Sequence, residues 1–198
     1  MAFRPSSLAW TLCILGLLAV LGLALSLPSK APSEGVATIG GVGGPFTLTD
    51  QDGNTVTEKS WPNQYLLVYF GFTHCPDVCP TGLNTMAAAL DELPKQKANK
   101  IQPLLITVDP ARDTAADLKN YVGIFHPKLI GLTGTDKQIE QVKSAFKVYA
   151  EKQGDGDDYM VNHSAFTYLL NPYGDLVGLY SHGTTPKDMA SKINQVIK

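Results

Sequence analysis

Cys75 and Cys79 are the residues of this chain whose type and spacing most directly indicate chemistry. Three residues separate them, so in a helix or turn their β-carbons lie about 5–6 Å apart on one face. At that spacing two thiolates can hold one metal ion. They can also close a disulfide after a small backbone movement, because bridged β-carbons lie about 4 Å apart. The plainer alternative is a disulfide that only staples the turn, although so short a loop constrains the unfolded chain little.

The two cysteines lie where a predicted strand ends and a predicted helix begins. The apolar run at residues 65–70 is typical of a buried strand, and a helical pattern covers residues 80–93. Pro80 has no N–H for the Pro76 carbonyl, so we predict that the turn holding the cysteines is distinct from the helix. Unpaired N–H groups and the dipole at a helix start favour thiolates, which bind metals and attack disulfides.

The rest of the chain has the pattern of an α/β domain. Predicted strands cover residues 45–50, 55–57, 65–70, 101–108, 129–132, 164–170 and 176–180, and predicted helices cover 80–93, 114–125, 136–149 and 185–198. Asp113 is predicted to cap the helix at 114–125, and the stretch at 153–158 is predicted to be a polar, solvated loop. The order of elements matches a thioredoxin-like domain with an N-terminal β-hairpin and an insertion.

A third donor for the cysteines is predicted at His163. This residue precedes the strand at 164–170, which should run antiparallel to the strand at 65–70 and so begin at the same sheet edge. In thioredoxins a cis-proline faces the cysteines at this place. Two thiolates and one imidazole suit Cu(I), with Cu(II) and Zn(II) as alternatives, while a structural zinc site would need a fourth ligand. The alternative is a loop histidine that is bonded to a backbone carbonyl.

Three carboxylates are candidates to dock a partner or to modulate the site. Asp77 lies between the cysteines, and Asp109 and Asp113 follow the strand at 101–108. In parallel sheets, ligands and partners gather at the carboxyl ends of strands. Helix capping and turn formation are the alternative explanation of these residues.

The other three histidines are weaker candidates. His74 adjoins Cys75 and is at most a residue that tunes it, because neighbouring backbone carries both. His126 is predicted near a helix C-terminus, whose dipole explains it, and His182 is predicted to be solvated in a loop.

The N-terminus predicts a membrane anchor. Residues 8–27 carry no charge and are mostly apolar, and about 20 such residues cross a bilayer as one helix. Arg4 precedes the span and places the N-terminus in the cytoplasm, with a cleaved signal peptide as the alternative. Residues 28–44 predict a flexible tether to a domain at 45–198. Without an Arg-rich presequence, a bacterial inner membrane with a periplasmic domain is favoured over a mitochondrial inner membrane.

Charge and cysteine content exclude other classes. Of the 16 basic residues, Arg4 precedes the apolar span, so the part of the chain after the span has 15 basic and 18 acidic residues. This part is therefore acidic, and nucleic acid is not the expected partner. Of three cysteines, Cys13 lies within the apolar span. A disulfide scaffold is therefore not expected, even in an oxidising compartment.

Three segments form a specific combination when taken together. They are Gly-Phe-Thr-His-Cys-Pro-Asp-Val-Cys-Pro at residues 71–80, Val-Asp-Pro-Ala-Arg-Asp at 108–113, and His163 before an apolar strand. Together with Gly-Pro-Phe-Thr-Leu at 44–48, they resemble the Sco (SenC) family of copper chaperones for cytochrome c oxidase assembly, over about residues 43–198. Asn162 departs from the pattern, because many members of the family carry an acidic residue there.

The resemblance implies that Cys75, Cys79 and His163 bind copper, and that one N-terminal helix anchors the chain. It implies a metallochaperone that delivers copper to the binuclear copper site of oxidase subunit II. The alternative is a thiol–disulfide oxidoreductase that reduces the cysteines of that site. A second periplasmic copper chaperone or a thiol reductant would be a further partner. His163 separates the two functions, because copper needs it and disulfide exchange does not.

Overall fold

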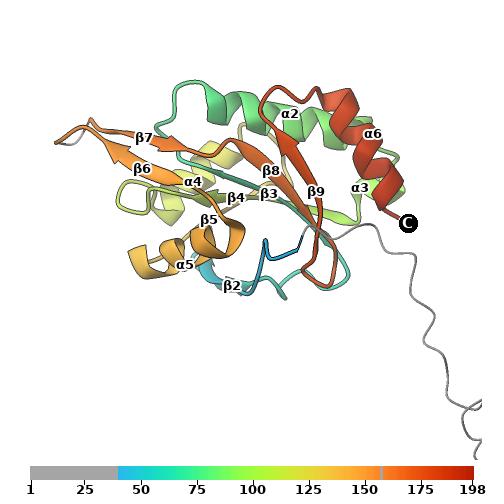
Figure 1. The fold of residues 1–198 in the computed structure, drawn as a ribbon, viewed down its shortest axis with the longest axis horizontal. Coiled ribbons are helices and arrows are strands. Elements are labelled where there is room, and N and C mark those ends of the chain that lie inside the picture. Colours follow the sequence, from blue (N-terminus) through green and yellow to red (C-terminus); the bar gives the residue numbers. More distant parts are fainter. Residues whose placement is uncertain (1–39, 157) are drawn as a thin grey trace, which may run out of the picture. The chain divides into compact units, whose positions relative to one another are not determined.

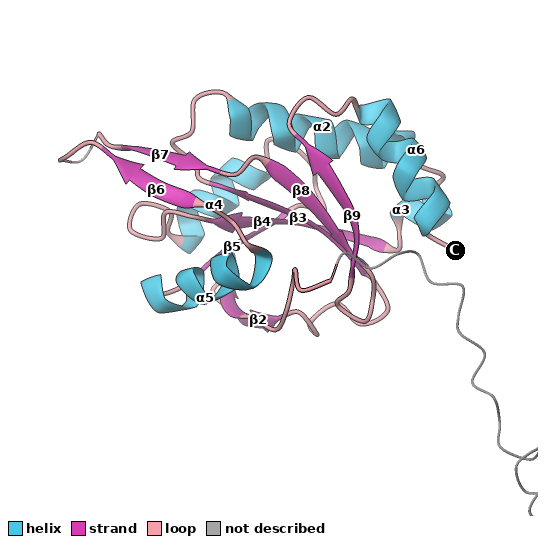
Figure 2. Ribbon diagram, viewed as in Figure 1, coloured by secondary structure: helices cyan, strands magenta, loops and turns pink. Residues whose placement is uncertain are grey.

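The computed structural model describes residues 40–156 and 158–198. The predicted anchor at 8–27 and residues 28–39 of the predicted tether lie outside these ranges. The described residues form an α/β fold in which helices cover both faces of a central sheet (Figures 1 and 2).

The elements agree in kind and order with most of the predicted ones. The strands are β1 (Thr47–Asp50), β2 (Thr55–Thr57), β3 (Tyr65–Gly71), β4 (Ile101–Thr107), β5 (Ile130–Thr133), β6 (Ala150–Gln153), β7 (Met160–His163), β8 (Phe166–Leu170) and β9 (Leu176–Ser181). The helices are α2 (Val78–Glu92), α3 (Lys95–Ala98), α4 (Ala115–Val122), α5 (Asp136–Phe146) and α6 (Pro186–Val196). The short helix α3 and the strands β6 and β7 were not predicted.

Seven strands make up the main sheet, in the order β2-β1-β5-β4-β3-β8-β9. β3, β4 and β5 run parallel, whereas β8 runs antiparallel to β3, as predicted. β3 is buried along nearly its whole length, as expected of a central strand covered on both faces. The C-terminal end of β3 and the N-terminal end of β8 therefore lie next to each other, on the side of the sheet where the parallel strands end.

Alternating side chains of β3 reach opposite faces of the sheet. The Tyr69 hydroxyl donates to the Val78 carbonyl at the start of α2 (3.1 Å). Phe70 points the other way and packs against Phe146 of α5 and Tyr168 of β8, with ring centroids 5.2 and 5.7 Å away. α2 and α6 pack together on the face of the sheet toward which Tyr69 points, and α5 covers the opposite face (Figure 1).

The helix that follows the cysteines begins earlier than predicted. α2 starts at Val78 instead of residue 80, so Cys79 lies in its first turn and Pro80 is its third residue. The first four N–H groups of a helix have no intrahelical partner, so a proline there interrupts no hydrogen bond. The predicted boundary between turn and helix was therefore wrong.

β6 and β7 pair as a two-stranded hairpin, and Gln153, the first residue of the predicted loop at 153–158, belongs to β6. The hairpin extends from the main sheet as a separate ribbon (Figure 1). Most of its residues are exposed, so apolar composition did not reveal the strands. His163 is the last residue of β7 and does not lie in a loop.

The described end of the predicted tether contacts the domain. The Gly43 N–H donates to the Ala145 carbonyl (3.0 Å), and Val42 packs against the core. Gly43 has a positive φ of 98°, and a β-carbon there would lie 3.3 Å from the Gly174 carbonyl oxygen, which explains the glycine. Among residues 40–156 and 158–198, no helix combines the length and apolar character needed to cross a membrane.

Candidate metal centre

Cys75, Cys79 and His163 converge at the edge of the sheet where β3 ends. One donor atom from each lies within 4.8 Å of the others, and Cys79 Sγ is 3.2 Å from His163 Nε2. Cys75 comes from the loop after β3, Cys79 from the first turn of α2, and His163 from the end of β7. The structure thus brings together the three residues singled out from the sequence.

Gly71 allows the Cys79 sulfur to lie against the end of β3. A β-carbon at position 71 would lie 2.7 Å from Cys79 Sγ and 3.1 Å from the Tyr69 ring. Because Cys79 is fully buried, a side chain there would push the sulfur out of place. The glycine is therefore part of the geometry of the site.

The two thiols are electrostatically unequal. The Cys79 N–H donates to Cys75 Sγ (3.4 Å), and a hydrogen bond from the Cys79 thiol lowers the pKa of Cys75 to about 4, against the effect of burial. The bond to Cys75 and burial raise the pKa of Cys79. Cys75 is therefore the thiolate of the metal-free pair, and with 7% of its surface exposed it is also the more accessible of the two.

The imidazole of His163 is oriented by its neighbours. Its Nδ1 lies 3.1 Å from the Ser164 carbonyl oxygen, which accepts a hydrogen bond, so Nδ1 carries the proton and Nε2 faces Cys79 with its lone pair. The rings of Tyr69 and Phe72 contact the imidazole edge to face, at centroid distances of 6.4 and 5.7 Å. The sequence left open whether His163 is a metal ligand or a histidine bonded to a backbone carbonyl. Its imidazole makes the carbonyl contact with one nitrogen and still presents the other nitrogen to the thiols.

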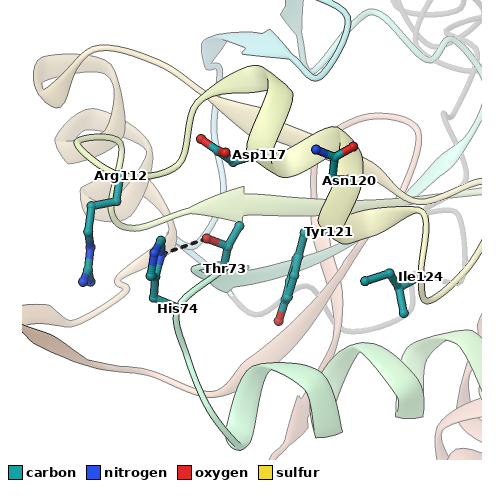
Figure 3. Close-up of a pocket in the computed structure, with 7 residues that line it drawn as sticks. All are labelled: Thr73, His74, Arg112, Asp117, Asn120, Tyr121 and Ile124. Atoms are coloured by element: carbon teal, nitrogen blue, oxygen red, sulfur yellow. Dashed lines mark hydrogen bonds between the residues drawn. The ribbon is translucent and has the colours of Figure 1, made fainter. Parts of the chain in front are cut away.

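His74 lies outside this group of donors and lines a separate hollow of about 560 Å³ (Figure 3). Its Nδ1 is 3.0 Å from the Thr73 hydroxyl. Tyr121 reaches into the same region, and its buried hydroxyl has no hydrogen-bond partner within the described residues. Burial, followed by the charge of the nearby thiols, raises the pKa of Tyr121.

The two remaining histidines lie apart from the thiols. His182 is exposed, as predicted. The prediction for His126 is corrected, because α4 ends four residues before it and burial lowers its pKa. Its Nδ1 accepts the Lys128 N–H (3.1 Å), which makes it part of a turn.

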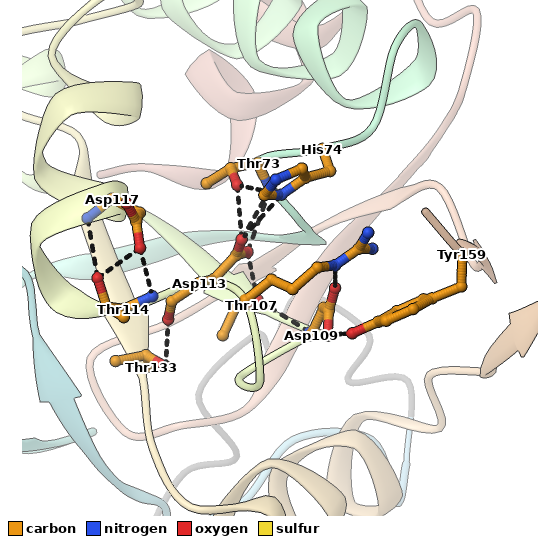
Figure 4. A network of polar contacts seen from close by, with 10 residues as sticks. Thr73, His74, Thr107, Asp109, Asp113, Thr114, Asp117, Thr133 and Tyr159 are labelled. Carbon is orange, nitrogen blue, oxygen red and sulfur yellow. Dashed lines mark hydrogen bonds and ion pairs between the residues drawn. The ribbon is translucent and has the colours of Figure 1, made fainter. Parts of the chain in front are cut away.

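Asp113 anchors the loop that leads to Cys75 (Figure 4). Its fully buried carboxylate accepts the N–H (3.1 Å) and the hydroxyl (2.6 Å) of Thr73, and the hydroxyl of Thr107 (2.6 Å). Burial raises its pKa despite these bonds. The predicted capping role was wrong, because Thr114 caps α4 in a capping box with Asp117.

Asp109 fastens the hairpin that carries His163. Its carboxylate accepts Arg112 Nε (2.6 Å) and the Tyr159 hydroxyl (2.5 Å). The Arg112 guanidinium lies 3.6 Å from the centroid of the Tyr159 ring, and Lys152 covers that ring as well. Tyr159, one residue before β7, was not identified from the sequence, although Tyr159, Val161 and His163 alternate with the exposed residues Met160 and Asn162, as expected of a strand.

Of the three candidate carboxylates, only Asp77 is exposed. It stands at the N-cap of α2 without a capping hydrogen bond from its side chain. Asp109 and Asp113 are buried and satisfied inside the domain, so they do not form a docking surface.

Comparison with known proteins decides the family. The SCO1/SenC family model matches residues 37–198. The chain belongs to this family. A mitochondrial SCO1 homologue of Arabidopsis thaliana is 42% identical over 170 residues, which are 85% of this chain and 49% of the relative. An SCO2-like protein of Rickettsia conorii is 46% identical over 151 residues, which are 75% of this chain and 73% of the relative. The chain thus spans about half the length of the Arabidopsis protein.

Solved members of the family share the fold. The crystal structure of Arabidopsis thaliana ScoI with copper bound matches with a TM-score of 0.75 and 40% identity, over 78% of this chain and 97% of that one. BsSco, described as having a disulfide switch and as a member of the Sco family of cytochrome c oxidase assembly proteins, matches with a TM-score of 0.63 and 28% identity, over 81% and 95%. These matches confirm the predicted thioredoxin-like α/β domain.

Proposed function

We propose that this protein is a membrane-anchored copper metallochaperone. It binds copper through Cys75, Cys79 and His163 and delivers the ion to the binuclear copper site of cytochrome c oxidase subunit II. The observation that carries the proposal is the meeting of two sulfurs and one imidazole nitrogen within 4.8 Å. This donor set suits Cu(I), and Cu(II) is the alternative. A relative with 40% identity has been solved with copper bound.

The properties of the site suit transfer of the copper ion better than its permanent storage. Three protein donors leave a position that a ligand of the partner can enter, and Cys75 lines a surface groove. A second periplasmic copper chaperone is a fitting source of the ion. Delivery then proceeds by exchange of thiolate and imidazole ligands between two proteins, with no net redox change.

A thiol–disulfide oxidoreductase is the second candidate, favoured by the unequal thiols. The Cys75 thiolate would attack a disulfide of subunit II, which releases one partner thiolate and leaves a mixed disulfide. The Cys79 thiolate would then attack Cys75 Sγ of this mixed disulfide and release the second partner sulfur as a thiolate. The partner gains two thiols while Cys75 and Cys79 become a disulfide, which a thiol reductant must reduce. The lowered pKa of Cys75 and the disulfide switch described for BsSco support this alternative.

Copper titration of the reduced protein against a competing Cu(I) chelator tests the metal site. We expect one Cu(I) per chain, and X-ray absorption that reports two sulfurs and one nitrogen around the metal. Thiol counting before and after loading should show that both cysteines become protected. A sulfur-only coordination sphere, or two thiols still titratable with copper present, would contradict the site.

We further propose that residues 8–27 hold the chain in a bacterial inner membrane, with the domain in the periplasm. The uncharged span and Arg4 before it support this topology. Protease added to unlysed spheroplasts should remove the domain. A domain that stays protected until the cells are lysed has the opposite orientation.

A further inference from the structure

The strand that carries His163 has an open edge. β7 pairs with β6 on one side, and within the described residues no strand pairs with its other side. Beyond the ladder, the Ser164 N–H donates to the Tyr149 carbonyl (2.9 Å). Because backbone groups alternate in an antiparallel pair, Asn162 then bonds to β6, while the N–H and C=O groups of Val161 and His163 point away from it. Neither residue has a backbone partner among the described residues.

This open edge borders a groove that ends at the metal centre. The groove has a volume of about 470 Å³ and is lined by Cys75, Pro76, Asp77, Val78, Tyr149 and residues 160–164. Of the two cysteines, only Cys75 reaches it. Two large side chains of its lining, Tyr149 and Met160, are 56% and 41% exposed although they are mostly apolar.

We propose that this groove receives an extended peptide segment of the protein with which copper is exchanged. The segment pairs with β7 as a third strand of the hairpin. It places a sulfur or nitrogen donor of its own beside Cys75, where that donor can bind the copper ion. The partner's identity as a copper protein rests on the proposed function above. Its extended conformation rests on the edge of β7, because two residues with unpaired N–H and C=O groups, two positions apart, match the repeat of an extended backbone.

His163 would then serve both partners at once. Its imidazole faces Cys79 and the metal, while its backbone N–H and C=O face the incoming strand. A strand bonded to that backbone stands next to the metal without displacing the ring. Docking and ligand exchange are therefore coupled through one residue.

A covalent trap in metal-free, full-length protein tests the docking mode. The probe is the peptide Thr-Val-Thr-Cys-Thr-Val-Thr, whose cysteine is joined to 2-thiopyridine as a disulfide. In a Cys79→Ser variant, Cys75 Sγ attacks the peptide sulfur, pyridine-2-thione leaves, and the peptide stays attached through a new disulfide. Residue-resolved amide hydrogen exchange is then compared with and without the peptide. We expect at least tenfold slower exchange at Val161 and His163, and less than a twofold change at Asn162.

The control peptide is N-methylated at its cysteine and at both flanking residues, so it attaches through the same disulfide but neither of its edges can pair as a strand around the cysteine. It should leave the Val161 and His163 amides unchanged. The proposal is overturned if the unmodified peptide slows neither amide, or if both peptides slow them equally. If the Val161 and His163 amides exchange slowly without peptide and faster when the protein is diluted, a second copy of the chain occupies the edge of β7. That result also overturns the proposal.

A second variant avoids the change at Cys79. Val161→Pro removes the N–H that faces the groove and leaves the ladder with β6 intact, a position where an edge strand tolerates proline. We expect the peptide to react with Cys75 at least fivefold more slowly in this variant, and 2,2′-dithiodipyridine to react at an unchanged rate. Equal slowing of both reagents contradicts docking at the edge. Because no copper is used, the copper titration and this test can fail independently.

Discussion

Replacing His163 with alanine is expected to weaken Cu(I) binding by well over tenfold while leaving the disulfide chemistry of Cys75 and Cys79 intact. Two thiolates alone still bind Cu(I), but the imidazole closes the coordination sphere and restricts exchange with free thiols. Losing a metal ligand should cost more than the roughly 1 kcal/mol of an ordinary hydrogen bond, and a tenfold change corresponds to about 1.4 kcal/mol. Disulfide formation requires only the two sulfurs.

The measurements are competition with a Cu(I) chelator and mass spectrometry after oxidation. On oxidation, both the His163→Ala protein and the unsubstituted protein should lose the mass of two hydrogens, which reports the Cys75–Cys79 disulfide. His182→Ala makes the same chemical change at an exposed position and should bind copper normally. If His163→Ala binds Cu(I) with unchanged affinity and still supports oxidase assembly, the chaperone site is wrong and the oxidoreductase function becomes the better explanation.

Asp113→Ala is expected to lower the free energy of unfolding by about 3 kcal/mol, because it leaves buried donors of Thr73 and Thr107 without an acceptor. Asp113→Asn should cost less, about 1 kcal/mol, since an amide oxygen can still accept from Thr73. Burial already raises the pKa of Asp113, so the site penalises the charged form and tolerates a neutral group of the same shape.

Chemical denaturation of the metal-free protein measures this effect. Asp117→Ala is the matched control, because it removes an exposed carboxylate from the capping box of α4 and should cost only about 1 kcal/mol. The loop that Asp113 holds leads directly to Cys75, so Cu(I) affinity should fall in the alanine variant as well. An Asp113→Ala protein as stable as Asp117→Ala would show that the buried network does not support the loop.

Local sequence patterns predicted many of the strands and helices of this structure. The apolar run at 65–70 and the apolar segments at 164–170 and 176–180 predicted strands, since strands that are buried in a sheet leave runs of apolar residues that are visible in the sequence. The helix start at residue 80 was misplaced by two positions, because a proline in the first turn is compatible with both assignments. The position of His163 opposite the cysteines followed from the antiparallel course of one strand.

The donor types, their spacing within residues 75–79, and the order of elements that brings His163 to them could be predicted without a structure. These properties depend on neighbouring residues and on strand direction. By contrast, the folded chain was needed to show that Asp113 holds a loop 40 residues away and that the Tyr159 hydroxyl bonds to Asp109 across 50 residues. A buried carboxylate acquires its role from the hydrogen-bond donors that folding brings to it, and those donors leave no local periodicity in the chain.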